Sequence, residues 1–133
     1  MRLFRAGKTV VAAMGLMSSQ LLWFLGLRSV ARWIVMTLVR VSPDNENAYL
    51  TMGSYYERSG KLAEAVTWYE RAREISPHDP GVYFELASIC EKNGNRRSAA
   101  DNYDRFLHLS PEISVEFRRE IAGRIAHLRN VEH

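Results

Sequence analysis

The sequence has a single cysteine, Cys90, and no glycine-rich phosphate loop. One cysteine excludes an intrachain disulfide and a zinc site built from several thiolates. The four histidines are scattered without the spacing of metal ligands, and no Ser-His-Asp set or carboxylate pair in a cleft is apparent. We therefore expect a protein that is not an enzyme and has no metal, no cofactor and no small-molecule substrate.

Acidic residues are missing from the first part of the chain. Residues 1–41 carry six basic and no acidic residues, whereas 42–133 carry twelve basic and fifteen acidic ones, which together give the net charge of +3. The positive charge thus belongs to an apolar N-terminal region. The rest of the chain has no arginine-lined face with interleaved aromatic residues of the kind that follows a phosphate backbone. We expect no binding to nucleic acid.

The most informative pattern present is an internal repeat with a fixed period. It divides the middle of the chain into two successive copies, 46–79 and 80–113. The first copy has Tyr49, Met52, Gly53, Tyr56, Ala65, Tyr69, Ala72 and Pro77, and the second has Tyr83, Leu86, Ala87, Cys90, Ala99, Tyr103, Phe106 and Pro111. These residues at this spacing resemble the tetratricopeptide repeat, whose copies are helix hairpins of about 34 residues.

Elementary helix chemistry supports the same interpretation. Apolar residues recur every three or four positions in two runs per copy, as in amphipathic helices. Gly60 and Gly94 interrupt these runs at equivalent places, and a proline ends each second helix because it disfavours helical geometry in the preceding residue. Gly53 is small where two helices are expected to approach closely, and Cys90 is expected to be a packed apolar thiol. The predicted fold is an all-α solenoid.

An apolar segment precedes the repeats. Residues 9–27 contain no charge, and as a helix they span roughly 28 Å, close to the hydrocarbon thickness of a bilayer. Residues 1–27 are therefore expected to form a basic N-terminus and an uncleaved single-pass anchor. A cleaved signal peptide and a mitochondrial presequence are the alternatives. The expected location is a bacterial inner membrane or an organellar membrane, and the distribution of positive charge slightly favours repeats outside the cytoplasm.

Residues 28–45 fit two descriptions. Counting back one period from the first copy places Ala31, Val35, Leu38 and Pro43 in repeat slots, which predicts the second helix of a degenerate repeat. The matching first helix, at about 13–26, fits the pattern poorly. A helix lying along a membrane surface would show the same basic and apolar residues. The residues expected to pack are Val30, Ile34, Val35, Leu38 and Val41, with Arg28, Arg32 and Arg40 on one side.

The C-terminal segment, 114–133, is expected to cap the solenoid. Two repeats rarely bury their own hydrophobic faces, so a further helix has to cover the second one. We expect this helix to start at Pro111. Its apolar stripe is Phe117, Ile121, Ile125 and Leu128, and its polar outer face is Arg118, Arg119, Glu120, Arg124 and His127.

The resemblance also implies a concave groove lined by the first helix of each hairpin. The positions that face this groove in the family are Asn47, Leu50, Ser54, Glu57, Gly81, Phe84, Ser88 and Glu91. Such a mixture suits an extended or helical peptide with an apolar side chain and a basic group. Alternatively, Leu50 and Phe84 pack against the flanking helices.

Recognition of an acidic chaperone tail is not expected. Of the five positions that form the basic clamp for such tails in one branch of the family, only Arg119 matches. The others are Leu50, Ser54, Glu85 and Val115. Glu85 would repel an acidic peptide.

These observations predict a membrane-anchored adaptor that binds other proteins or peptides through its repeat groove, in the assembly or maturation of a membrane complex. Contact with the membrane would be made by residues 9–27. The alternative is a structural subunit of a stable multiprotein complex, with the hydrophobic N-terminus buried against partner subunits. The two differ in whether residues 42–133 alone bind the partner.

Overall fold

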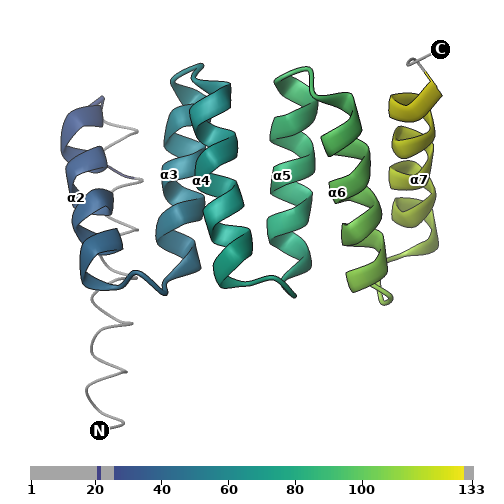
Figure 1. Ribbon diagram of the computed structural model, residues 1–133, viewed down its shortest axis with the longest axis horizontal. Coiled ribbons are helices and arrows are strands. Elements are labelled where there is room, and N and C mark those ends of the chain that lie inside the picture. The colour runs from purple at the N-terminus through teal and green to yellow at the C-terminus, as the bar shows by residue number, and fades with distance from the viewer. Residues whose placement is uncertain (1–20, 22–25, 131–133) are drawn as a thin grey trace, which may run out of the picture.

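The computed structural model of the chain describes residue 21 and residues 26–130. Within these residues the chain is helical and has no strand. The helices are α2 (Arg28–Val41), α3 (Glu46–Arg58), α4 (Leu62–Ile75), α5 (Pro80–Lys92), α6 (Arg96–Leu109) and α7 (Val115–Asn130). They follow one another in a single row (Figure 1). The predicted all-α solenoid is confirmed.

The helices follow the period of the sequence. α2, α4 and α6 each have 14 residues, and α3 and α5 each have 13. Gly26, Gly60 and Gly94, which are separated by one period each, precede α2, α4 and α6 with φ of 81°, 75° and 81°. Glycine reaches this left-handed region without strain, so all three helices begin after the same kind of turn.

Hydrogen bonds across the loops repeat in the same way. The Tyr49 hydroxyl donates to the Pro43 carbonyl over 3.1 Å, and the Tyr83 hydroxyl donates to the Pro77 carbonyl over 2.9 Å. Each bond ties the loop after a second helix to the helix that follows. The loop after α2 is therefore held like the loop between the two hairpins, and α2 stands where the second helix of an earlier hairpin would stand.

The core consists of the repeat slots identified in the sequence. Ala65, Tyr69 and Ala72 are buried on α4, and one apolar cluster extends from there through α7. At Gly53, an added Cβ would lie 2.7 Å from the Tyr69 ring, which confirms the close approach of α3 and α4. Cys90 is buried, as predicted.

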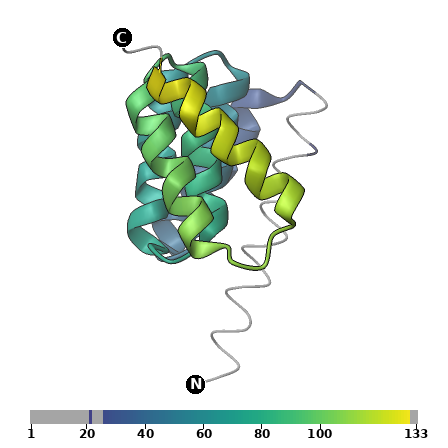
Figure 2. The same ribbon diagram turned by 90° about the vertical axis from the view of Figure 1, so that its right-hand side faces the viewer.

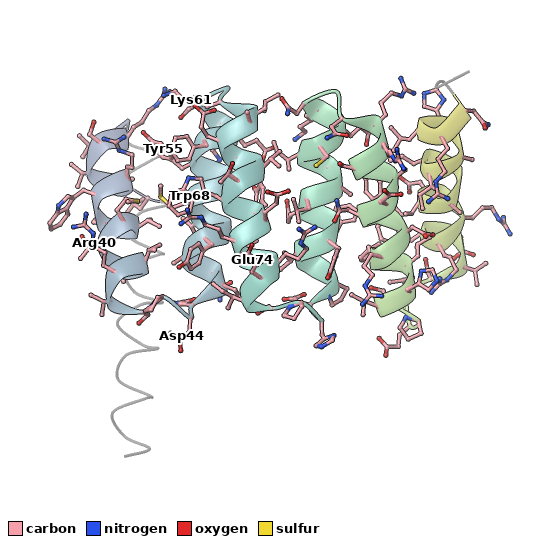
Figure 3. All side chains as sticks on the ribbon, in the orientation of Figure 1. Arg40, Asp44, Tyr55, Lys61, Trp68 and Glu74 are labelled. Atoms are coloured by element: carbon pink, nitrogen blue, oxygen red, sulfur yellow. The ribbon has the colours of Figure 1, made fainter. Side chains whose placement is uncertain are left out.

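Helix α2 packs on α3 through one face only. Ala31, Val35 and Leu38, three of the slots predicted for a repeat-like helix, are buried. Trp68 of α4, labelled in Figure 3, packs partly buried against the same cluster. Val30 and Val41, however, are exposed, so the prediction that they pack was wrong. The turn of the helix places them on the side away from α3.

Helix α7 covers the end of the second hairpin. Ile121, Ile125 and Leu128 are buried and Phe117 is partly buried, so the predicted apolar stripe is confirmed. The helix crosses α6 obliquely (Figure 2). It starts at Val115, and not at the Pro111 that the sequence suggested.

Two arginines of α7 contact α6. Arg118 donates to the carbonyls of Leu107 and Ser110 over 3.3 and 2.7 Å, where α6 ends. Arg124 lies over the Tyr103 ring, 5.7 Å from its centre. The outer-face prediction was wrong for Arg118, which is partly buried because its long side chain reaches back to the carbonyls at the end of α6. Arg124 is exposed, as predicted, and in addition covers an aromatic face of α6.

No helix within residues 26–130 is long and apolar enough to cross a membrane. The predicted anchor, 9–27, lies outside the described residues except for positions 21, 26 and 27.

Candidate functional site: a concavity between the first helices

A concavity of about 250 Å³ opens between α3 and α5. Five of its lining residues come from α3, and α4 and α5 contribute one each. They are Asn47, Leu50, Thr51, Ser54, Glu57, Tyr69 and Glu85. The structure thus brings together four of the residues predicted for the groove: Asn47, Leu50, Ser54 and Glu57.

Helical spacing explains why α3 presents this face. Positions 47, 50, 51, 54 and 57 follow one another at intervals of one to three along one side of the helix. Ala48 and Met52 on the opposite side are buried against α2. Leu50 is only partly buried and packs against the main core, so it is the apolar part of the concavity.

Glu57 already has partners within the chain. The Tyr69 hydroxyl donates to its Oε2 over 3.2 Å, and Lys92 forms an ion pair with its Oε1. Lys92 is the last residue of α5, so this pair joins the first hairpin to the second. The burial of Tyr69 and the nearby carboxylates raise the pKa of that phenol, so it remains a hydrogen-bond donor.

Glu91 is held in the same way one repeat later. The Tyr103 hydroxyl donates to Glu91 Oε2 over 3.1 Å, and Arg124 Nε of α7 lies 3.6 Å from the same oxygen. Burial, first, and the carboxylate of Glu91, second, raise the pKa of Tyr103. Glu57 therefore links the two hairpins and Glu91 links the second hairpin to α7, roles that the sequence pattern did not indicate.

Glu85 differs from these two acids. Among the described residues it forms no ion pair. Its side chain is exposed, but partial desolvation by the surrounding helices, followed by repulsion from Glu57, raises the pKa of its carboxyl group, and Lys92 lowers this pKa only in part. Glu85 is thus an unpaired carboxylate beside Leu50, in a place where a further positive charge would be stabilised.

The predicted groove residues of α5 do not reach this concavity. Phe84 is partly buried, and its ring centre lies 5.2 Å from that of Phe106 and 6.1 Å from that of Phe117. These distances are typical of packed aromatic pairs, which supports the packing alternative for Phe84. Ser88 is partly exposed and also does not line the concavity.

Sequence reasoning missed Glu85 as a site residue. It considered this side chain only as a source of repulsion for an acidic tail. The signal that could have found it is its place in the repeat, because position 85 is the equivalent of position 51 in the first copy. Thr51 follows the groove residue Leu50 and lines the concavity on α3. Its equivalent on α5 is Glu85, which lines the concavity from the other side.

A second concavity, of about 420 Å³, lies beside the loop after α2. Glu74 of α4 and Asp44 of that loop both lie at this end of the molecule (Figure 3). Its lining is mostly polar and includes no residue predicted for the groove: Pro43, Tyr49, Thr67, Glu70, Arg71, Glu74 and Ile75.

The described part of the chain has neither a cluster of metal ligands nor a reactive thiol. There, no three His, Cys, Asp or Glu side chains come together in a way that could hold a metal ion. Burial, first, and Glu70, second, raise the pKa of the Cys90 thiol, which keeps it protonated and unreactive.

Comparison with known proteins agrees with this architecture. The sequence model of the tetratricopeptide repeat family matches residues 46–89. No curated protein sequence matches the chain. One similar solved structure is the Yersinia enterocolitica type III secretion translocator chaperone SycD, with 12% identity, 93% of this chain and 87% of that chain covered, and a TM-score of 0.77.

Two further structures are similar and contain a bound segment of another protein. One is PcrH, a Pseudomonas aeruginosa protein, in complex with the chaperone-binding region of PopD. It has 12% identity, 94% of this chain and 96% of that chain are covered, and the TM-score is 0.76. The other is the first repeat domain of Spaghetti (RPAP3) bound to the HSP90 peptide SRMEEVD. It has 19% identity, 86% of this chain and 93% of that chain are covered, and the TM-score is 0.70. At these identities the likeness shows the fold, a tetratricopeptide-like helical solenoid.

Proposed function

We propose that the protein is an adaptor that binds a peptide segment of a partner protein in the concavity between α3 and α5. The proposal rests on one observation: Leu50 and Glu85 line the same concavity. Leu50 is partly exposed, and the carboxylate of Glu85 forms no ion pair among the described residues. An apolar anchor beside a few placed polar groups is the usual composition of a recognition site.

The lining defines the chemistry of the ligand. An apolar side chain of the peptide packs on Leu50, and a lysine or arginine pairs with Glu85. The hydroxyl of Ser54 and the amide of Asn47 are available for hydrogen bonds to the peptide backbone. Glu57 adds negative potential close to Glu85, so an acidic peptide is repelled.

The comparisons support a protein-binding role. PcrH and Spaghetti (RPAP3) have this fold and are each seen with a segment of another protein. The HSP90 peptide in the second structure, SRMEEVD, ends in acidic residues. Because Glu85 and Glu57 lie in the concavity here, we propose a basic ligand for this chain and not an acidic tail.

We further propose that residues 9–27 hold the adaptor at a membrane, with the repeats outside the cytoplasm. The support for the membrane contact is the uncharged length of this segment. Three basic residues precede it and three follow, so the charge favours this orientation only slightly. A partner brought to the groove would then be held next to the bilayer, as the assembly or maturation of a membrane complex requires.

Peptide binding to the full-length chain in detergent micelles tests the proposed ligand. The probes are fluorescein-labelled peptides of alanine and serine with one leucine and one lysine, the lysine being placed at different distances from the leucine. A matched set has glutamate in place of lysine. Fluorescence anisotropy is expected to show binding of at least one lysine peptide, and about tenfold weaker binding of its glutamate counterpart.

Two variants and their controls assign this binding to the concavity. Leu50→Asp and Glu85→Lys are expected to weaken binding of the lysine peptide by about tenfold or more, with little change in Tm. Two control variants are expected to leave binding unchanged: Val115→Asp on α7 and Glu64→Lys on α4. Val115 is 65% exposed, and Glu64 lies on the exposed side of its helix.

Three results would contradict the proposal. Equal binding of the lysine and glutamate peptides would exclude Glu85 as the determinant. A large fall in Tm for Leu50→Asp would make Leu50 a core residue. Association of a partner only with chains that retain residues 1–41 would favour the structural-subunit alternative.

A further inference from the structure

The outward side of α2 has exposed apolar residues in one stripe. Val30 is 45%, Trp33 69% and Val41 58% exposed. With Thr37 they occupy positions 30, 33, 37 and 41, which follow one another along one side of a helix. The Thr37 hydroxyl donates to the Trp33 carbonyl over 2.9 Å, so this hydroxyl already has a partner. The indole N–H of Trp33 is the other side-chain donor of the stripe, and at the depth of lipid headgroups it can bond to water or to a headgroup.

Three of these four positions are polar on the other second helices. On α4, the equivalents of Val30, Trp33 and Thr37 are Glu64, Thr67 and Arg71, and on α6 they are Ser98, Asp101 and Arg105. The equivalents of Val41 are apolar, Ile75 and Leu109, and both are partly buried. Glu64, Thr67 and Arg71 are exposed, as the outer side of a solenoid in water requires. The apolar residues Val30 and Trp33 are therefore a property of α2 and not of the repeat.

The charges around the stripe favour an anionic partner. Helix α2 contains no acidic residue, and Arg32 and Arg40 are exposed. Figure 3 shows Arg40 on the outer side of α2. Beyond this helix, residues 42–133 have three more acidic than basic residues, so an anionic surface would attract α2 and repel the repeats.

We infer that this face of α2 lies in the headgroup region of a bilayer that contains anionic lipid. The face is defined by Val30, Trp33 and Val41, with Arg32 and Arg40. Tryptophan is favoured at this depth, and arginines next to apolar side chains are typical of helices that lie in the interface. The inference rests on the proposed membrane attachment, because the apolar segment 9–27 ends where α2 begins. The lipid contact would fix how the solenoid is oriented on the membrane.

Quenching of Trp33 by brominated lipid tests the contact. The chain has three tryptophans, so Trp23→Phe with Trp68→Phe leaves Trp33 as the single emitter in the full-length chain. The probes are vesicles of brominated phosphatidylcholine with or without phosphatidylglycerol. Trp33 is expected to be quenched, more strongly when the anionic lipid is present and most by bromines close to the headgroup. Arg32→Glu with Arg40→Glu is expected to abolish the difference in Trp33 quenching between vesicles with and without the anionic lipid.

The repeat supplies a matched control. In a chain with Trp23, Trp33 and Trp68 replaced by Phe, Thr67→Trp places the single tryptophan in the equivalent slot of α4. This tryptophan is expected to remain unquenched, and circular dichroism checks that both chains are folded.

Flotation of the same samples separates this inference from the proposed anchor. If the chain floats with vesicles but Trp33 and the Thr67→Trp control are quenched equally or not at all, the lipid contact of α2 is refuted while the anchor stands. If the chain does not float, both are refuted. If Trp33 emission shifts with protein concentration in the absence of lipid, the face binds a second copy of the chain and the inference is wrong.

Discussion

Gly53→Ala is expected to destabilise the first hairpin although alanine is the better helix former. Gly53 lies inside α3, where replacement by alanine normally stabilises a helix by about 1 kcal/mol. Here the added Cβ would lie 2.7, 2.8 and 2.9 Å from three carbons of the Tyr69 ring. Side-chain carbons in contact ordinarily lie roughly 3.5 Å or more apart, so either the ring or the helix has to move.

The surroundings of Tyr69 determine the size of the effect. Tyr69 is 2% exposed and its hydroxyl is bonded to Glu57, so the ring cannot move without disturbing the core and that bond. Overpacking of this kind costs about 1–3 kcal/mol. The second hairpin has Ala87 in the equivalent slot, so a small separation of α3 and α4 relieves part of the overlap. After the gain in helix propensity of about 1 kcal/mol, we expect a net loss of up to about 2 kcal/mol.

Gly123→Ala is the matched control. Gly123 lies in α7, and an added Cβ would have no neighbour within 4 Å. This variant is expected to stabilise the chain by about 0.5–1 kcal/mol, so chemical denaturation of the two variants should give changes of opposite sign. Tyr69→Leu should remove most of the cost of Gly53→Ala in a double-mutant cycle. An increase in stability for Gly53→Ala comparable to that for Gly123→Ala would refute the close approach of α3 and α4.

Three further predictions concern the cap, the thiol and the acidic site. Ile121→Ala should cost about 2–5 kcal/mol in urea unfolding, while Val115→Ala should change stability by less than about 0.5 kcal/mol; equal effects would refute the cap. Cys90 should react with a thiol reagent only after unfolding, because it is buried with a raised pKa; rapid reaction of the native chain would contradict this. The pKa of Glu85 is higher in the folded chain than in the unfolded chain. Stability therefore falls as the pH rises from the pKa of the unfolded chain through that of the folded chain. Glu85→Gln should therefore raise Tm at neutral pH but not at acidic pH, and a lower Tm at neutral pH would contradict the sign.

The fold was predictable because its signals are local. Gly60 and Gly94 adopt positive φ where the runs of helix are interrupted, and the loop prolines follow the second helices. Ala65 and Tyr69 are buried in the slots that the repeat assigns to them. These features depend on residues close in the chain and on a fixed period, both of which a sequence displays.

The misjudged residues depend on neighbours that the sequence does not display. Helix α2 has apolar residues on two sides, and only its contact with α3 decides that Val35 is buried and Val30 is exposed. Arg118 looks solvated by spacing, but its length lets it reach α6. At the candidate site, Leu50 was predictable from its position in the repeat, whereas the unpaired state of Glu85 depends on Lys92 pairing with Glu57 instead.

Mapping of amide chemical shifts tests the proposed groove most directly. The isotope-labelled full-length chain in detergent micelles would be titrated with the lysine peptide that binds best. Shifts are expected to concentrate at Asn47, Leu50, Ser54 and Glu85, with none at Thr67 on the outer side of α4. Saturable shifts on the outer side of α4 alone, or none anywhere along α3 and α5, would contradict a peptide-binding groove between these helices.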